Sequence, residues 1–293
     1  MRPAVAPTAS LLVAVLAMSW AGPLIRFTHA PAIAVSAWRL ALSVLFIALV
    51  LAVRRVPLPR LGRVDWLLGV AAGIFLALHF WSWIASLDLT TVSSSVVLVS
   101  AQPLFVAVLS AALLAEPATR RQWLGIVVAV AGAAVIGWGD FGRGRDALIG
   151  DALALAGALF ISGYYVIGRR LRLQLDLWWY IGIVYGVAAV ALFTVAAALP
   201  GVALFGYGRT DWLIFLALAA GPMMLGHTGI NYALRYLRAY VANLAVLGEP
   251  IGATLIAWAL PGIREVPGPQ SLVGGMLILG GVLLTVTGRR VPV

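Results

Sequence analysis

The chain has 293 residues, of which 63% are hydrophobic and only 10% are charged, and its mean hydropathy is +1.04. A soluble domain has roughly a quarter of its residues charged, so this composition excludes an ordinary soluble protein. The net charge is +10, and its Arg residues cluster between apolar stretches. That placement is typical of membrane loops rather than of a nucleic-acid-binding surface. Without Cys, the chain has neither disulfides nor thiol chemistry.

Ten apolar stretches follow one another, each near the ~20 residues that a helix needs to cross ~30 Å of hydrocarbon. The first is interpreted as a retained span rather than a signal peptide, because nine more follow it. Connections between the stretches are short, and none is large enough for a soluble domain. The expected spans are Ser10–Phe27, Pro31–Val53, Asp65–Leu87, Thr91–Ala115, Gln122–Gly137, Gly150–Gly168, Asp176–Leu199, Asp211–Leu234, Ala239–Leu260 and Gln270–Gly288.

The distribution of Arg predicts the orientation of these spans. With the N-terminus in the cytoplasm, the inner segments hold 14 Arg residues and the outer loops hold four, while Arg26 and Arg39 lie at or inside spans. Positive residues concentrate in cytoplasmic loops. We therefore expect a multi-pass protein of the inner (plasma) membrane with both termini in the cytoplasm.

The second half of the chain repeats features of the first about 147 positions later. A polar residue followed by Pro interrupts span four at Gln102 and span nine at Glu249, and such breaks are pointers to a transporter's binding site. Other matched pairs are Asp65-Trp66 with Asp211-Trp212, Glu116 with Glu265, and Gly125, Gly132 and Gly139 with Gly274, Gly281 and Gly288.

Each half holds five spans, an odd number, so the second half enters the membrane from the opposite side. The expected fold is therefore all-α, with ten transmembrane helices as two inverted repeats, residues 1–148 and residues 149–293. The alternative is that the repeated Gly and Ala reflect only general helix packing.

Several short motifs carry a resemblance to a known family: Trp38-Arg39-Leu40-Ala41-Leu42, Ala101-Gln102-Pro103-Leu104, Leu113-Leu114-Ala115-Glu116, Gly125-Ile126, Tyr232-Ala233-Leu234 and Gly248-Glu249-Pro250. In this order and spacing the chain resembles the drug/metabolite transporter superfamily, in its ten-span EamA branch. The resemblance implies an inner-membrane carrier with an inverted 5+5 fold and a central substrate cavity. Members of the family move amino acids, purines, other small metabolites and drugs, often outward.

Polar and aromatic groups inside spans are the candidates for lining such a cavity, because groups of this kind usually face the interior of a membrane bundle. His79 and Trp83 share one face of span three, and His227 and Asn231 share one face of span eight. The full set of candidates is Trp20, His79, Trp83, Ser94, Gln102, Tyr164, His227, Asn231 and Glu249. Aromatic walls suit an apolar body, and amides, hydroxyls and imidazoles suit a polar head group. Each also has a simpler reading as a packing residue, a back-bonded hydroxyl or part of an interfacial belt.

Two ionisable residues inside spans require partners. For Arg39 we favour a structural ion pair with Asp88 or Glu249 over a role in binding a substrate carboxylate. Glu249 is the only acidic residue near the middle of any span. We favour a structural role, in which its carboxyl caps backbone groups freed by Pro250, over a role in proton coupling.

The expected function is secondary transport, with export of small organic metabolites, neutral or aromatic amino acids first among them, by alternating access. A passive facilitator or channel, an exporter of drugs or purine-type metabolites, and a membrane enzyme or scaffold are the alternatives. Motifs for a metalloprotease, a serine hydrolase or an ATP-binding loop are absent from the sequence, so no enzyme activity, cofactor or metal is expected. The expected partners are a small-molecule substrate and the lipid bilayer, with no nucleic acid, and a monomer is the simplest oligomeric state.

Overall fold

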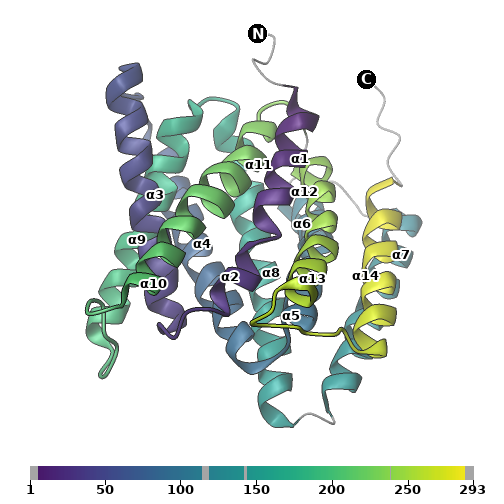
Figure 1. Cartoon of the computed structure of the whole chain (residues 1–293). Helices are drawn as coiled ribbons and strands as arrows, with labels where there is room; N and C mark the ends of the chain where they lie inside the picture. The colour runs from purple at the N-terminus through teal and green to yellow at the C-terminus, as the bar shows by residue number, and fades with distance from the viewer. Residues whose placement is uncertain (1–5, 114–118, 142–143, 238, 288–293) are drawn as a thin grey trace.

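The computed structural model describes residues 6–113, 119–141, 144–237 and 239–287, which are helical with no strand (Figure 1). The motif residues Leu114, Ala115 and Glu116 and the repeat residue Gly288 lie outside these ranges. The helices are α1 (Pro7–Met18), α2 (Ala21–Ile25), α3 (Ala32–Arg54), α4 (Arg63–Leu89), α5 (Val92–Val99), α6 (Gln102–Leu113), α7 (Arg120–Phe141), α8 (Arg145–Arg172), α9 (Leu177–Ala198), α10 (Arg209–Leu218), the π-helix η1 (Ala219–His227), α11 (Thr228–Ala233), α12 (Ala239–Ala245), the 3₁₀-helix η2 (Val246–Gly248), α13 (Glu249–Ala259) and α14 (Pro269–Thr287).

The expected all-α class is confirmed for the described part of the chain. Seven of its helical segments are long and apolar enough to cross a membrane, by length and composition. They are Pro7–Ile25, Ala32–Arg54, Arg63–Leu89, Val92–Leu109, Arg145–Arg172, Leu177–Ala198 and Arg209–Ala233. Two shorter apolar helices, Trp123–Ile136 and Val246–Ala259, accompany them. A multi-pass membrane protein follows from these segments.

Both polar-Pro pairs interrupt their helices as expected. α5 ends at Val99, and α6 begins at Gln102 with Pro103 in its first turn. The 3₁₀-helix η2 ends at Gly248, and α13 begins at Glu249 with Pro250 in its first turn. Proline is well tolerated in the first turn of a helix, because its missing N–H has no partner there in any case. The two polar residues are therefore placed at the start of a half-helix within the bundle.

Span eight differs from the single α-helix that the sequence led us to expect. Its central part, Ala219–His227, is π-helical and contains Pro222. Proline has no N–H to donate and its ring clashes with the preceding turn, so a widened turn is a local solution to its presence. The wider turn shifts every side chain that follows it around the helix axis.

Helices from the two halves of the chain pack against one another throughout the bundle. α4 lies along α8 and α9, α3 lies along α9, and α1 lies along η1 and α11. The pair α7 and α14 stands at one side of the molecule (right in Figure 1). Helix α1 begins and α14 ends at the same end of the bundle. The interior between these layers is the buried core that surrounds the site.

Close approach of α7 and α14 depends on glycine. A Cβ atom on Gly132 would lie 2.6 Å from the carbonyl oxygen of Gly274 and 2.8 Å from the backbone nitrogen of Ile278. A Cβ on Gly274 would likewise lie 2.6 Å from the carbonyl oxygen of Gly132. Small residues at membrane helix interfaces allow this contact between backbones.

Candidate functional site

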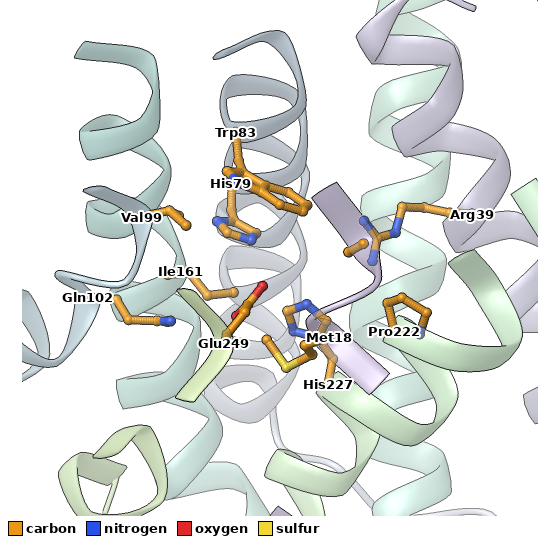
Figure 2. A pocket seen from close by; sticks show the side chains of 11 residues that line it. Met18, Arg39, His79, Trp83, Val99, Gln102, Ile161, Pro222, His227 and Glu249 are labelled. Atoms are coloured by element: carbon orange, nitrogen blue, oxygen red, sulfur yellow. The ribbon is translucent and has the colours of Figure 1, made fainter. Parts of the chain in front are cut away.

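A small cavity lies in the middle of the bundle, where helices from both halves of the chain meet (Figure 2). Its volume of about 20 Å³ is room for about one water molecule. It is lined by Met18, Ala21, Arg39, His79, Trp83, Val99, Gln102, Ile161, Pro222, His227 and Glu249. The two half-helix starts of α6 and α13 therefore face the same space as α4 and η1.

Of the nine candidate residues from the sequence, five line this cavity: His79, Trp83, Gln102, His227 and Glu249. They come from α4, α6, η1 and α13, which lie far apart in the chain. All five are buried. The structure thus brings together one aromatic ring, two imidazoles, one amide and one carboxyl around a common centre.

His79 presents a defined face to the cavity. Its Nδ1 lies 2.9 Å from the carbonyl oxygen of Gly157 on α8. Because a carbonyl only accepts, Nδ1 carries the proton and donates, which leaves Nε2 of the neutral ring as an acceptor. The ring stacks on Trp83, with 6.1 Å between centroids and 3° between planes. One turn of α4 therefore supplies a flat aromatic wall with a hydrogen-bond acceptor beside it.

His227 stands opposite this wall on the π-helix η1. Its ring centroid lies 6.1 Å from that of His79 and 5.1 Å from that of Phe80, edge to face in both cases. The Tyr165 hydroxyl lies 3.4 Å from His227 Nδ1. His227 is the last residue of the π-helix that contains Pro222.

Several buried polar atoms on the cavity wall have no hydrogen-bond partner within the described residues. They are Arg39 Nε, Nη1 and Nη2, Trp83 Nε1 and Gln102 Oε1. Buried polar groups in proteins are nearly always satisfied, and each exception calls for an explanation. Donors and an acceptor left free around one cavity are what a polar ligand requires.

The ion pair expected for Arg39 is absent. Within the described part of the chain the guanidinium forms neither a hydrogen bond nor an ion pair with Asp88 or Glu249. It instead lies over the ring of Phe80, with 4.1 Å from Cζ to the centroid. Asp88 lies at the end of α4 and lines a separate space at the end of the bundle, which we call the vestibule. Arg39 therefore makes no contacting ion pair, and of the two expected partners only Glu249 lies near it, as the opposite charge in the same cavity.

The expected capping role of Glu249 is likewise not seen, because its carboxyl accepts no backbone N–H among the described residues and faces the cavity instead. Gln102, its counterpart in the repeat, also faces the cavity, and its backbone carbonyl accepts a hydrogen bond from the Ser162 hydroxyl at 2.9 Å. The two matched positions thus contribute side chains to one space.

Four candidates do not line the cavity. Trp20 is 45% exposed, between the end of α1 and the start of α2. The Ser94 hydroxyl lies 3.3 Å from that of Ser271. Tyr164 and Asn231 are fully buried and hydrogen-bonded to each other, and Asn231 also donates to the carbonyl of His227 at 2.8 Å. Tyr164 and Asn231 therefore support the cavity wall from behind.

The cavity has lining residues that sequence reasoning did not select. Met18, Ala21, Val99, Ile161 and Pro222 are apolar or lack a distinctive group, and nothing in their local pattern separates them from ordinary core residues. Arg39 was noticed in the sequence, but as an ion-pair residue. Its charge within a span was the signal that points to the site.

A second, wider space of about 540 Å³ opens at the end of the bundle where α4 ends. Arg26 and Glu265 lie on its wall, 3.8 Å apart, and Arg26 also donates to the carbonyl oxygen of Thr90 at 2.7 Å. Glu265 accepts the backbone N–H groups of Val92 and Ser93 at 3.0 and 2.9 Å. This polar network ties the first turn of α5 to the loop before α14.

Comparison with known proteins agrees with this architecture. The model of the EamA-like transporter family matches the chain twice, over residues 8–138 and 148–287. The chain therefore belongs to the EamA-like transporter family, a family of membrane transporters.

Individual relatives are more distant. The chain is 27% identical over 224 residues to the "Uncharacterized transporter YdfC" of Bacillus subtilis, covering 72% of this chain and 68% of that one. It is 29% identical over 202 residues to the "Probable terminal-alkyne amino-acid exporter" of Streptantibioticus cattleyicolor, covering 66% of this chain and 64% of that one. A crystal structure with 21% identity has the same fold, with a TM-score of 0.69 over 97% of this chain and 99% of the other.

Proposed function

We propose that this transporter is a secondary carrier that exports small organic metabolites, with neutral or aromatic amino acids as its main substrates. The observation that carries the proposal is the central cavity, where an aromatic wall of Trp83 and His79 faces the carboxyl of Glu249. An aromatic wall suits an apolar side chain, and a carboxyl accepts hydrogen bonds from an ammonium group. The name of the Streptantibioticus relative, an amino-acid exporter, agrees with this choice of substrate.

Alternating access is the mechanism that the small size of the cavity supports. About 20 Å³ holds about one water and no amino acid. Transport therefore requires the helices around the cavity to move apart on one side and then on the other. The breaks before Gln102 and Glu249 are positions where half-helices can tilt separately.

The proposed architecture is ten spans in two inverted halves, residues 1–148 and 149–293, in the inner membrane with both termini in the cytoplasm. The packing supports this arrangement. Contact of the third span with the sixth (α4 with α8) is mirrored by contact of the eighth with the first (η1 and α11 with α1). The fifth and tenth spans (α7 and α14) pack on each other, as do the second and seventh (α3 and α9). A two-fold axis in the membrane plane produces this pattern.

The proposal is tested with purified protein in liposomes. Uptake of radiolabelled neutral amino acids should saturate with concentration, and unlabelled amino acid inside the liposomes should accelerate it. A channel or passive facilitator gives uptake without such counterflow, and a scaffold gives none. Absence of saturable uptake for every amino acid tested, together with saturable uptake of a purine or a drug, would transfer the proposal to that substrate class.

A further inference from the structure

The guanidinium of Arg39 on α3 is a fully buried cation with one face occupied and its edge free. The ring of Phe80 lies 4.1 Å below Cζ and covers a face of the planar group. Nε, Nη1 and Nη2 have no hydrogen-bond partner among the described residues. The side chain points into the cavity from the side opposite α6 (Figure 2).

Comparison with a second buried arginine shows that this state is specific to Arg39. Arg172 at the end of α8 is also buried. Its Nε donates to the carbonyl of Asn231 at 3.0 Å, and its Nη1 donates to the carbonyl of Leu175. Arg172 is thus a structural arginine with hydrogen-bond partners in the protein, whereas the N–H groups of Arg39 have no hydrogen-bond partner among the described residues.

Contact with Phe80 alone does not satisfy the guanidinium. A ring below the plane interacts with the charge but accepts none of the N–H groups along the edge. A buried charge is strongly unfavourable unless it is both paired and hydrogen-bonded. Glu249 in the same cavity supplies an opposite charge to Arg39, but the described residues supply no hydrogen-bond acceptor, so the N–H edge is free for a partner that enters the cavity.

The free edge identifies the chemistry of that partner. A guanidinium edge presents parallel N–H donors that match the two oxygens of a carboxylate in a bidentate pair. Glu249 lines the same cavity, so a solute with an anionic and a cationic group finds opposite charges in one space. A simple amine has no acceptor and leaves the edge of Arg39 unmatched, whereas an uncharged nucleobase can accept its N–H groups but does not neutralise its charge.

We propose that Arg39 is the receptor for the carboxylate of the transported solute. The proposal rests on the proposed function and narrows its substrates to carboxylates, with zwitterionic amino acids fitting both Arg39 and Glu249. Stacking on Phe80 fixes the plane of the guanidinium, so the carboxylate is oriented and the rest of the solute is directed toward the wall of His79 and Trp83.

The test compares Arg39→Met with the matched control Arg172→Met in purified protein. Three probes distinguish the contributions of the carboxylate and the amine to binding. They are L-phenylalanine, which has both groups, 3-phenylpropionate, which lacks the amine, and phenethylamine, which lacks the carboxylate. In the parent, L-phenylalanine and 3-phenylpropionate, the two probes with a carboxylate, should raise the thermal unfolding temperature, because ligands that bind the folded state stabilise it. Loss of a charge-assisted bidentate pair should weaken their binding to Arg39→Met about 10- to 100-fold.

The stability of the ligand-free variants provides a second reading. Arg39→Met removes a buried charge that has no hydrogen-bond partner, so its unfolding temperature should equal or exceed that of the parent. Arg172→Met leaves carbonyl oxygens unmatched and should unfold at a lower temperature, with the preference for carboxylates over phenethylamine kept. Equal binding of the carboxylates by parent and Arg39→Met overturns the proposal, as does a parent that is stabilised by phenethylamine but by neither carboxylate.

Failure of the proposed function gives a different result. If 3-phenylpropionate stabilises the parent through Arg39 but the parent exchanges no amino acid in liposomes, the carboxylate site is kept and the assignment of amino acids as substrates is rejected. If the parent and Arg39→Met exchange amino acids with the same KM, the proposed function is kept and the carboxylate site at Arg39 is rejected.

Discussion

Arg26 at the end of α2 and Glu265 in the loop before α14 form an ion pair, with 3.8 Å between Nη2 and Oε2. The same carboxylate accepts the N–H groups of Val92 and Ser93, the first two residues of α5. A carboxylate at this position satisfies donors that have no partner within the helix and interacts favourably with the helix dipole. Glu265 therefore connects α2 and the loop before α14 to the start of α5, the first part of the broken span that carries Gln102.

Glu265→Ala should lower the stability of the protein by about 1–3 kcal/mol, because it leaves two N–H groups at the start of α5 without their acceptor. Thermal unfolding in detergent measures the change. Asp88→Ala is the matched control, since Asp88 lines the same vestibule and its carboxyl forms no hydrogen bond with a described residue. An equal loss in both variants would show that vestibule charge in general, and not the cap, is responsible.

Gly132→Ala should disrupt the pairing of α7 with α14. The added Cβ would lie 2.6 Å from a backbone oxygen, which cannot move without shifting the helix, and such overpacking costs about 1–3 kcal/mol. Gly280→Ala is the control on α14, because nothing lies within 4 Å of its added Cβ. Thermal unfolding should separate the two, with Gly280→Ala close to the parent. Equal unfolding temperatures for both variants would contradict the close contact.

Much of the fold was predictable from the sequence, because a bilayer is crossed only by apolar segments of sufficient length whose backbone hydrogen bonds are satisfied internally. Span length and hydropathy predicted the all-helical class and the seven segments of the described residues that are long enough to cross a membrane, and the polar-Pro pairs predicted the interruptions before Gln102 and Glu249. Those inferences need only local sequence, since length and backbone satisfaction are local properties in a membrane.

The arrangement of the site was less predictable, because helix geometry changes where the site forms. Trp20 was selected for its place in the body of span one, but α1 ends at Met18 and α2 begins at Ala21, so Trp20 lies at a break in the helix that its local sequence did not predict. Trp20 consequently lies on the surface, between cavity residues Met18 and Ala21. The state of Arg39 depends on which residues surround it in space, and a single sequence does not contain that information.

His79→Ala should reduce saturable amino-acid exchange, because it removes both the ring stacked on Trp83 and the Nε2 acceptor. Trp20→Ala should leave exchange close to the parent, since that side chain is 45% exposed and does not line the cavity. Initial rates at several concentrations in liposomes measure both variants. A loss with Trp20→Ala and none with His79→Ala would place the substrate elsewhere.

Single cysteines test the proposed topology, because the chain has none of its own. We expect Arg145→Cys, at the start of α8 and on the outer side in the proposed topology, to react with a membrane-impermeant thiol reagent added to intact cells. We expect Arg60→Cys, in an inner loop, to react only after the cells are opened. Both positions are exposed. The reverse pattern would invert the orientation, and labelling of both from outside would contradict the span count between them.

The central claim is that the solute passes through the cavity between α4, α6, η1 and α13, and a cysteine in that cavity tests it most directly. Val99 lines the cavity at the end of α5 and is 4% exposed, whereas Val190 on α9 is 67% exposed. In Val99→Cys protein, we expect a small thiol reagent to block exchange of the best amino-acid substrate, and excess substrate to slow the modification. Val190→Cys should lose no exchange when modified. Full exchange after complete modification at residue 99, or blocked exchange without protection by substrate, would contradict the claim.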